Sequence, residues 1–133
     1  MRIALDTNVV VSALATRGLC ADLFQAVLAE HDLLVGETVL GELRRVLSRK
    51  LRLPAATIDA LEAFLRRQAI VVTAEAAGRS TTLDAADAMV VAEAEAAAAD
   101  VLVTGDEDLL KAPNLPVKTA SPRQLWELIR RAP

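Results

Sequence analysis

Four acidic residues are the strongest candidates for chemistry in this chain. Asp6 directly follows the apolar segment Arg2-Ile3-Ala4-Leu5, and Asp106 comes two residues after the apolar segment Val101-Leu102-Val103-Thr104. Because sites in open α/β sheets lie at the carboxyl ends of the strands, we expect these two acids to meet at one edge of a parallel sheet. Taken singly, each acid could equally cap the turn or helix that follows it.

A third acid, Asp87, lies near the start of an Ala-rich segment, three residues after Asp84. This spacing fits Asp84 as a helix N-cap, with Asp87 interacting favourably with the helix dipole. The neighbouring residues Ala85-Ala86 and Ala88–Val91 indicate burial, however, and a buried carboxylate needs a partner or a metal ion. Capping explains Asp84 better than it explains Asp87.

The fourth acid, Glu42, falls at the edge of the apolar face of a predicted helix over Val39–Lys50. Taken alone, Glu42 is better explained by a surface ion pair with Arg45 or Arg49, which would stabilise the helix only slightly.

The residue types that are scarce also restrict the chemistry. His31 is the only histidine, and it lies in a predicted helix-to-strand turn away from the acids, while tyrosine is absent. A metal-free ribonuclease would normally need histidines as general acid and base, and a zinc site would need His or Cys ligands. A set of oxygen ligands instead suits Mg²⁺ or Mn²⁺, which activates water and neutralises phosphate charge.

Composition places these residues in one globular domain over residues 1–133. The single cysteine, Cys20, allows no intrachain disulfide and fits a reducing cytoplasm. No apolar run is long enough for a membrane span, so we expect no membrane association. The net charge of −3 argues against a broadly basic nucleic-acid-coating protein, although metal ions bound to clustered acids would offset part of it.

Hydrophobic patterning predicts strands that alternate with helices, which implies a three-layer α/β/α sandwich around a parallel sheet. The predicted strands are Ile3–Asp6, Leu33–Val35, Ile70–Thr73, Val101–Thr104 and Val117–Thr119. The predicted helices are Ala21–Glu30, Val39–Lys50, Ala55–Arg67, Asp84–Ala99 and Pro122–Arg131.

Basic residues gather on the helix that contains Glu42, at Arg44, Arg45, Arg49 and Lys50. They would suit contacts with RNA phosphates, and they would equally suit a solvated helix face.

In the order and spacing of its motifs, the chain resembles the PIN-domain family, in particular the VapC-like toxins of bacterial toxin–antitoxin pairs. The matching segments are Leu5-Asp6-Thr7-Asn8, Glu42-Leu43, Asp87-Ala88-Met89-Val90-Val91-Ala92, and Val103-Thr104-Gly105-Asp106 followed by Asp108-Leu109-Leu110. The closing segment Ala120–Leu125 is similar to the C-terminal segment of one branch of the family. No single motif is specific, but the four acids in this order are a strong combined signal.

The resemblance implies an endoribonuclease that uses Mg²⁺ or Mn²⁺ and leaves a 5′-phosphate and a 3′-hydroxyl. It assigns the metal and the catalysis to Asp6, Glu42, Asp87 and Asp106, with Asn8, Thr104 and Asp108 in support. The branch compared usually has more acids before the long helix, so a second metal ion at Asp84 stays open. The family also implies an antitoxin partner and a homodimer.

Two other classes remain as alternatives. A phosphatase of the haloacid dehalogenase type would need a second aspartate at position 8, where this chain has Asn8, and a response-regulator receiver would need adjacent acids near the first strand. A noncatalytic PIN-like module that binds RNA or protein would normally lack one of the four acids, and none is missing here.

Overall fold

A five-stranded parallel sheet forms the centre of the computed structural model, which describes residues 1–75 and 83–131. The strand order is β3-β2-β1-β4-β5, and each neighbouring pair is parallel. The apolar runs predicted as strands therefore belong to a sheet that is covered on both faces. The strands are β1 (Arg2–Leu5), β2 (Asp32–Gly36), β3 (Ile70–Val72), β4 (Val101–Val103) and β5 (Thr119–Ala120).

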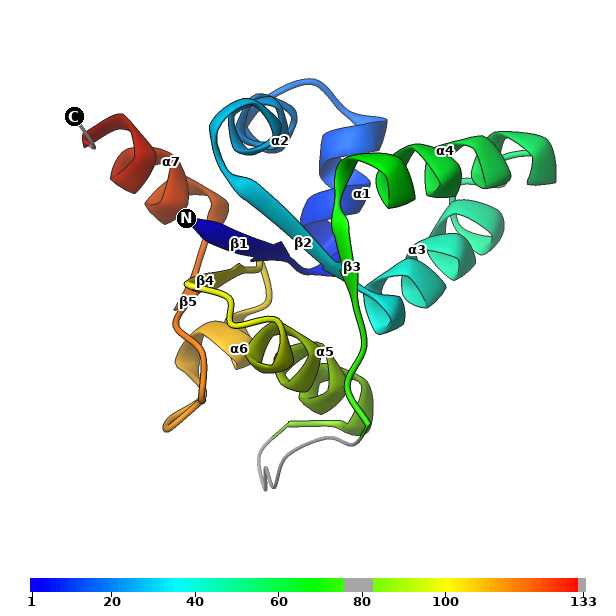
Figure 1. Ribbon diagram of the computed structural model, residues 1–133. Helices are drawn as coiled ribbons and strands as arrows, with labels where there is room; N and C mark the ends of the chain where they lie inside the picture. Colours follow the sequence, from blue (N-terminus) through cyan, green and yellow to red (C-terminus); the bar gives the residue numbers. More distant parts are fainter. Residues whose placement is uncertain (76–82, 132–133) are drawn as a thin grey trace.

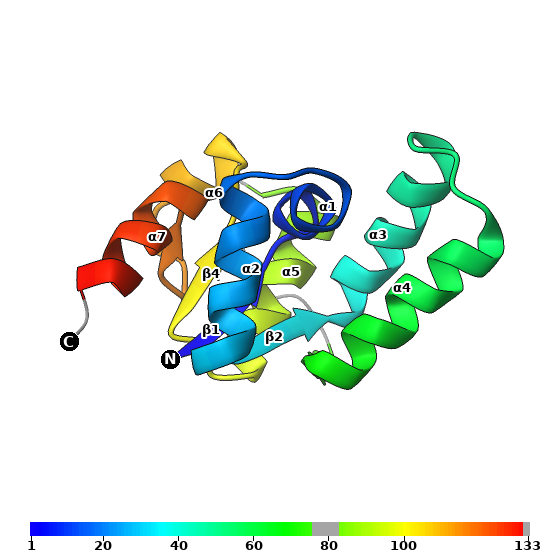
Figure 2. The same cartoon turned by 90° about the horizontal axis from the view of Figure 1, so that it is seen from above.

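Helices cover both faces of this sheet, which confirms the predicted α/β/α sandwich (Figures 1 and 2). α1, α2 and α7 lie on one side and α5 and α6 on the other, while α3 and α4 pack against each other beside the sheet edge formed by β2 and β3. The helices are α1 (Thr7–Ala15), α2 (Leu19–Glu30), α3 (Glu37–Arg49), α4 (Ala55–Gln68), α5 (Ala85–Ala96), α6 (Glu107–Lys111) and α7 (Pro122–Arg131).

Aliphatic side chains form the core, as the scarcity of aromatic residues requires. Ile3, Leu34 and Val103 of the central strands are fully buried, and Val10, Leu43 and Leu125 cover them from the helices. Among the described residues, no single helix is long and apolar enough to cross a membrane; α1 and α2 would reach that length only as a pair bent by 101°.

Two helices were missing from the sequence prediction, and both begin at an acid of interest. Asp6 is the N-cap of α1, and Asp106 is the N-cap of the five-residue α6. The β-branched run Val9–Val11 has a low helix propensity, and α6 is shorter than the window that reveals helical periodicity, so neither pattern signalled a helix.

Most of the predicted boundaries shift by one or two residues in the structure, and two of the differences have a clear structural cause. The long helix ends at Ala96 rather than Ala99, because Ala98 adopts a left-handed backbone conformation with φ 53°. The last strand is Thr119–Ala120 rather than Val117–Thr119, because its register is set by pairing of Thr119 with Leu102 and of Ala120 with Val103.

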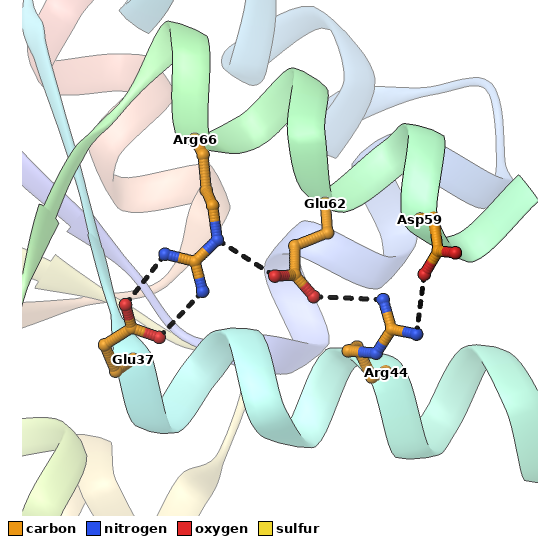
Figure 3. Close-up of polar contacts among 5 residues, drawn as sticks. All are labelled: Glu37, Arg44, Asp59, Glu62 and Arg66. Atoms are coloured by element: carbon orange, nitrogen blue, oxygen red, sulfur yellow. Dashed lines mark hydrogen bonds and ion pairs between the residues drawn. The ribbon is translucent and has the colours of Figure 1, made fainter. Parts of the chain in front are cut away.

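An ion-pair network joins α3 to α4 (Figure 3). Arg66 binds both oxygens of Glu37, at 2.8 and 2.9 Å, and also Glu62 at 2.9 Å. Arg44 binds Glu62 at 3.0 Å and Asp59 at 2.8 Å. These pairs are partly exposed and each stabilises weakly, but the connected network sets how α4 packs on α3, the helix that contains Glu42.

Candidate active site

The strand order reverses its direction at β1, which has β2 on one side and β4 on the other. In open α/β sheets such a switch point opens a crevice beyond the carboxyl ends of the strands. Asp6 follows the last residue of β1, and Asp106 lies three residues beyond the end of β4. Ala4 pairs with Leu102 and Leu5 with Val103, so the two strands end level and direct both acids to the same edge.

Asp6 is held rigidly at this edge. Its side chain is only 5% exposed and accepts three hydrogen bonds. Oδ1 accepts from the backbone N–H of Thr7 at 2.8 Å, which is the helix cap, while Oδ2 accepts from the Thr104 hydroxyl at 2.7 Å and the Asn8 amide at 3.3 Å. Capping and a site function are therefore compatible for Asp6.

Thr104, Gly105 and Asn8 join the β4 end to the β1 end. The Thr104 hydroxyl accepts from the backbone N–H of Asp106 at 3.0 Å while it donates to Asp6. Asn8 Oδ1 accepts from the backbone N–H of Gly105 at 3.0 Å. Asn8 and Thr104 therefore both contact Asp6 and the backbone that follows β4.

Asp106 is half-buried and caps α6, where Oδ1 accepts from the backbone N–H of Asp108 at 2.9 Å. Asp108 contributes this backbone group, whereas its own side chain is exposed. The structure therefore brings the backbone of Asp108, and not its carboxylate, into contact with Asp106.

Glu42 contacts α1 at Thr7, a residue that the sequence did not single out as a site residue. The Thr7 hydroxyl donates to Glu42 Oε2 at 3.2 Å. Glu42 Oε1 is buried and has no hydrogen-bond partner among the described residues. Among the described residues, no direct ion pair joins Glu42 to Arg45 or Arg49, although the charge of Arg45 acts to lower the pKa of Glu42. Glu42 is therefore held by Thr7 and not by the direct surface ion pair that the sequence suggested. The only sequence signal for Thr7 was its place between Asp6 and Asn8.

Asp87 lies in the first turn of α5 and is half-buried. Asp84 is the N-cap of this helix and accepts from the backbone N–H of Asp87 at 2.8 Å, so the predicted cap is confirmed. Asp84 itself is exposed and does not line the pocket described next.

The four predicted acids line one open pocket of about 450 Å³. They come from four different parts of the chain, which only the fold brings together. Thr7, Asn8 and Lys50 add polar groups to the lining, and Val11, Val46 and Leu51 form an apolar wall. Across residues 1–75 and 83–131, no three Asp, Glu, His or Cys side chains already converge as ligands of one ion.

The four carboxylates that line this pocket suit a hard divalent cation. They offer oxygen ligands, the type that Mg²⁺ and Mn²⁺ prefer. Glu42 Oε1 is the most telling atom, because a buried carboxylate oxygen without a partner is costly unless a cation neutralises it. Binding would require the acids to move closer together than they lie in this structure.

Burial and the repulsion between neighbouring carboxylates raise the pKa values of acids in this pocket. Burial raises the pKa of Asp87 to about 6, and the charges of Asp84, Asp106, Asp6 and Glu42 contribute. Burial is also the main cause of the raised pKa of Glu42, with the charges of Asp6 and Asp84 adding to it. Acids whose pKa values are raised by burial and by neighbouring acids in one pocket are typical of functional sites.

We expect the metal-free protein to become more stable as the pH falls from about 7.5 to 5. The folded-state pKa of Asp87 lies above its ordinary value of 3.8, so its favourable contribution is complete below pH 3.8 and is lost as the pH rises through about 6. Below about pH 4.5 the trend reverses, because ion pairs with arginine lower the pKa values of Glu37 and Glu62.

Thermal melting in EDTA across this pH range checks the expectation. Asp87→Asn should flatten the rise, whereas the exposed Asp22→Asn should keep it. A wild-type melting temperature that falls steadily from pH 7.5 to 5 would contradict the repulsion described for this pocket.

The basic residues of α3 divide into two groups. Arg44 is bound to Asp59 and Glu62, so its guanidinium is already engaged (Figure 3). Arg45 and Arg49 are exposed and line an adjacent hollow between α3 and α4, while Lys50 lines the acidic pocket itself. Among the described residues, none of these three forms an ion pair.

Comparison with known proteins now assigns the family. Residues 2–108 match a family model described as the PIN domain. The chain therefore belongs to the PIN domain family. A search of curated proteins found no matching sequence.

Solved structures with the same fold include three bacterial assemblies. VapBC2 from Rickettsia felis, bound to a DNA fragment from its promoter, has a chain that is 15% identical with a TM-score of 0.64, over 91% of this chain and 98% of that one. VapBC-1 from nontypeable Haemophilus influenzae has a chain that is 13% identical with a TM-score of 0.62, over 92% of this chain and 99% of that one. FitAcB from Neisseria gonorrhoeae has a chain that is 18% identical with a TM-score of 0.58, over 91% of this chain and 98% of that one. At these identities the likeness concerns the fold.

Proposed function

We propose that this protein is an endoribonuclease that depends on Mg²⁺ or Mn²⁺. The observation that supports the proposal is the buried, unpartnered Glu42 Oε1 in a pocket that also contains Asp6, Asp87 and Asp106. A divalent cation bound there would activate water and neutralise charge on the cleaved phosphodiester. The products expected are a 5′-phosphate and a 3′-hydroxyl.

The chain's own residues have distinct tasks in this proposal. Asp6, Glu42, Asp87 and Asp106 would hold the metal ion. Thr104 and Asn8 hold the Asp6 carboxylate in place, and Thr7 holds Glu42 Oε2, which would leave Oε1 available to a metal ion. Asp84 would take part only with a second ion, since it does not line the pocket.

RNA phosphates would contact the basic residues beside the acids. Within residues 1–75 and 83–131, Lys50 is the only basic residue that lines the acidic pocket, and Arg45 and Arg49 continue the positive charge along α3. We leave Arg44 out of this contact surface, because Asp59 and Glu62 already bind it. This distribution would attract the RNA backbone to one side of the site although the whole chain is acidic.

The role proposed in the cell is that of a toxin in a toxin–antitoxin pair, in the cytoplasm. The fold is that of chains in VapBC and FitAB assemblies, one of them bound to promoter DNA. By the same family resemblance we propose a cognate antitoxin as partner and a homodimer as the form of this chain.

Cleavage of RNA labelled at either end tests the enzymatic proposal. We expect cleavage with Mn²⁺, no cleavage with EDTA, and recovery when Mn²⁺ is added in excess. Analysis of the new ends should find a 5′-phosphate. Activity that persists unchanged in EDTA would overturn the metal-dependent mechanism, and RNA binding without cleavage at any Mn²⁺ concentration would favour the noncatalytic alternative.

A further inference from the structure

Glu93 is a buried acid that the sequence analysis did not select. It lies on α5, and only 3% of its surface is exposed. Both carboxylate oxygens accept from the backbone N–H of Thr38 in the first turn of α3, at 3.1 and 3.2 Å. The N-cap residue of α3, Gly36, offers no side chain, so Glu93 caps α3 from another helix. A carboxylate at this end also interacts favourably with the helix dipole.

Gly36 makes this contact possible. Its backbone φ of −78° is open to any residue, so conformation does not require glycine here. A Cβ atom at position 36 would instead overlap Glu93 Oε1 and lie 2.9 Å from Glu93 Cδ. The absence of a side chain at position 36 therefore lets the Glu93 carboxylate reach the start of α3.

The contact joins the two helices that contain candidate metal ligands. Glu42 lies one turn beyond Thr38 on α3, and Asp87 lies six residues before Glu93, about 9 Å along α5. No cation neutralises Glu93 among the described residues, and burial is the main cause of its raised pKa. A buried acid in this position needs a reason beyond packing, since a hydrophobic residue would be easier to bury.

We propose that Glu93 is a positioning residue, which sets the distance between Glu42 and Asp87 by anchoring the start of α3 to α5. The inference rests on the proposed function, because it takes both acids to bind the same metal centre. Glu93 acts through the ligands rather than on the metal, since it binds the backbone at the start of α3 and is not among the residues that line the acidic pocket. Residues that orient ligands in this way typically change metal affinity by about 10- to 100-fold when replaced.

The test measures the dissociation constant for Mn²⁺ by titration calorimetry, at a temperature where circular dichroism shows each variant folded. We expect Glu93→Ala to weaken Mn²⁺ binding by about 10-fold. Glu93→Gln keeps an acceptor for the Thr38 N–H and should recover most of the affinity. Glu95→Ala removes an exposed acid two residues along the same helix and should bind Mn²⁺ as the wild type does.

A double-mutant cycle with Gly36 separates positioning from general destabilisation. Gly36→Ala alone should displace the Glu93 carboxylate and weaken Mn²⁺ binding. Combined with Glu93→Ala it should add little, because the carboxylate is then gone and only the Cβ of residue 93, at 3.1 Å, still lies close to the added Cβ. Effects that simply add, or a lower melting temperature with unchanged Mn²⁺ affinity in Glu93→Ala, would overturn the proposal. A wild-type protein that binds no Mn²⁺ would overturn the proposed function, and this inference with it.

Discussion

Asp106→Asn is expected to fold as stably as the wild type in EDTA and to cleave RNA more than about 100-fold more slowly. Asn caps a helix as well as Asp does, so the hydrogen bond from the backbone N–H of Asp108 should survive. What the variant loses is a negative charge in the acidic pocket. A direct ligand should matter at least as much as the groups that orient ligands, whose replacement costs up to about 100-fold.

With Mn²⁺ present, the melting temperatures of the wild type and of Asp106→Asn should then differ. At 100 times its dissociation constant, a ligand that binds only the folded state stabilises it by about 2.7 kcal/mol, or roughly 10 °C for a chain of this size. Wild type should show this shift with Mn²⁺, and Asp106→Asn much less of it. Equal melting temperatures in both conditions, with equal cleavage, would mean that Asp106 is only a cap.

Glu42→Gln is expected to have the second large effect, a loss of cleavage of about 100-fold. The glutamine can still accept from the Thr7 hydroxyl, so the side chain should keep its place. In the pocket it offers an amide where the metal needs the oxygen Oε1. Metal-free stability should stay equal or rise, because burial opposes the charged form of Glu42 and raises its pKa.

Arg45→Ala is the matched control on the same helix. Its side chain is exposed and forms no direct ion pair with Glu42. Steady-state kinetics should show a higher KM at low salt with little change in kcat, because a phosphate contact adds binding rather than chemistry. If Glu42→Gln keeps near wild-type turnover, Glu42 is not a ligand and the four-acid site must be abandoned.

The class of fold and two of the acids were readable from local sequence. Short β-branched runs that alternate with longer amphipathic segments predict a parallel sheet covered by helices, because each pattern matches the period of one element. Asp6 and Asp106 follow two such runs, so their meeting at one edge needed only the assumption that both strands are central and parallel. Asp84 as an N-cap was equally local and is confirmed.

Tertiary structure alone decided which of several similar residues belong to the site. Arg44 and Arg45 are neighbours of the same charge, but only Arg44 meets acids of α4. Glu42 could have been a surface acid; the packing of α1 on α3 turns it to Thr7, 35 residues away in sequence. Glu93 lies among the buried residues Val90, Val91 and Ala94 of α5, and a charged residue within this apolar stretch was the one sequence signal for it.

The physical reason for this division is the range of the interactions. Helix periodicity, strand alternation and capping depend on residues within about one turn of each other, so the sequence by itself determined the elements and the acids at their ends. The contacts within the pocket and beside it join Asp6 to Thr104 across 98 residues and Thr7 to Glu42 across 35. Such contacts depend on which faces of the elements pack together, and only the folded chain decides that.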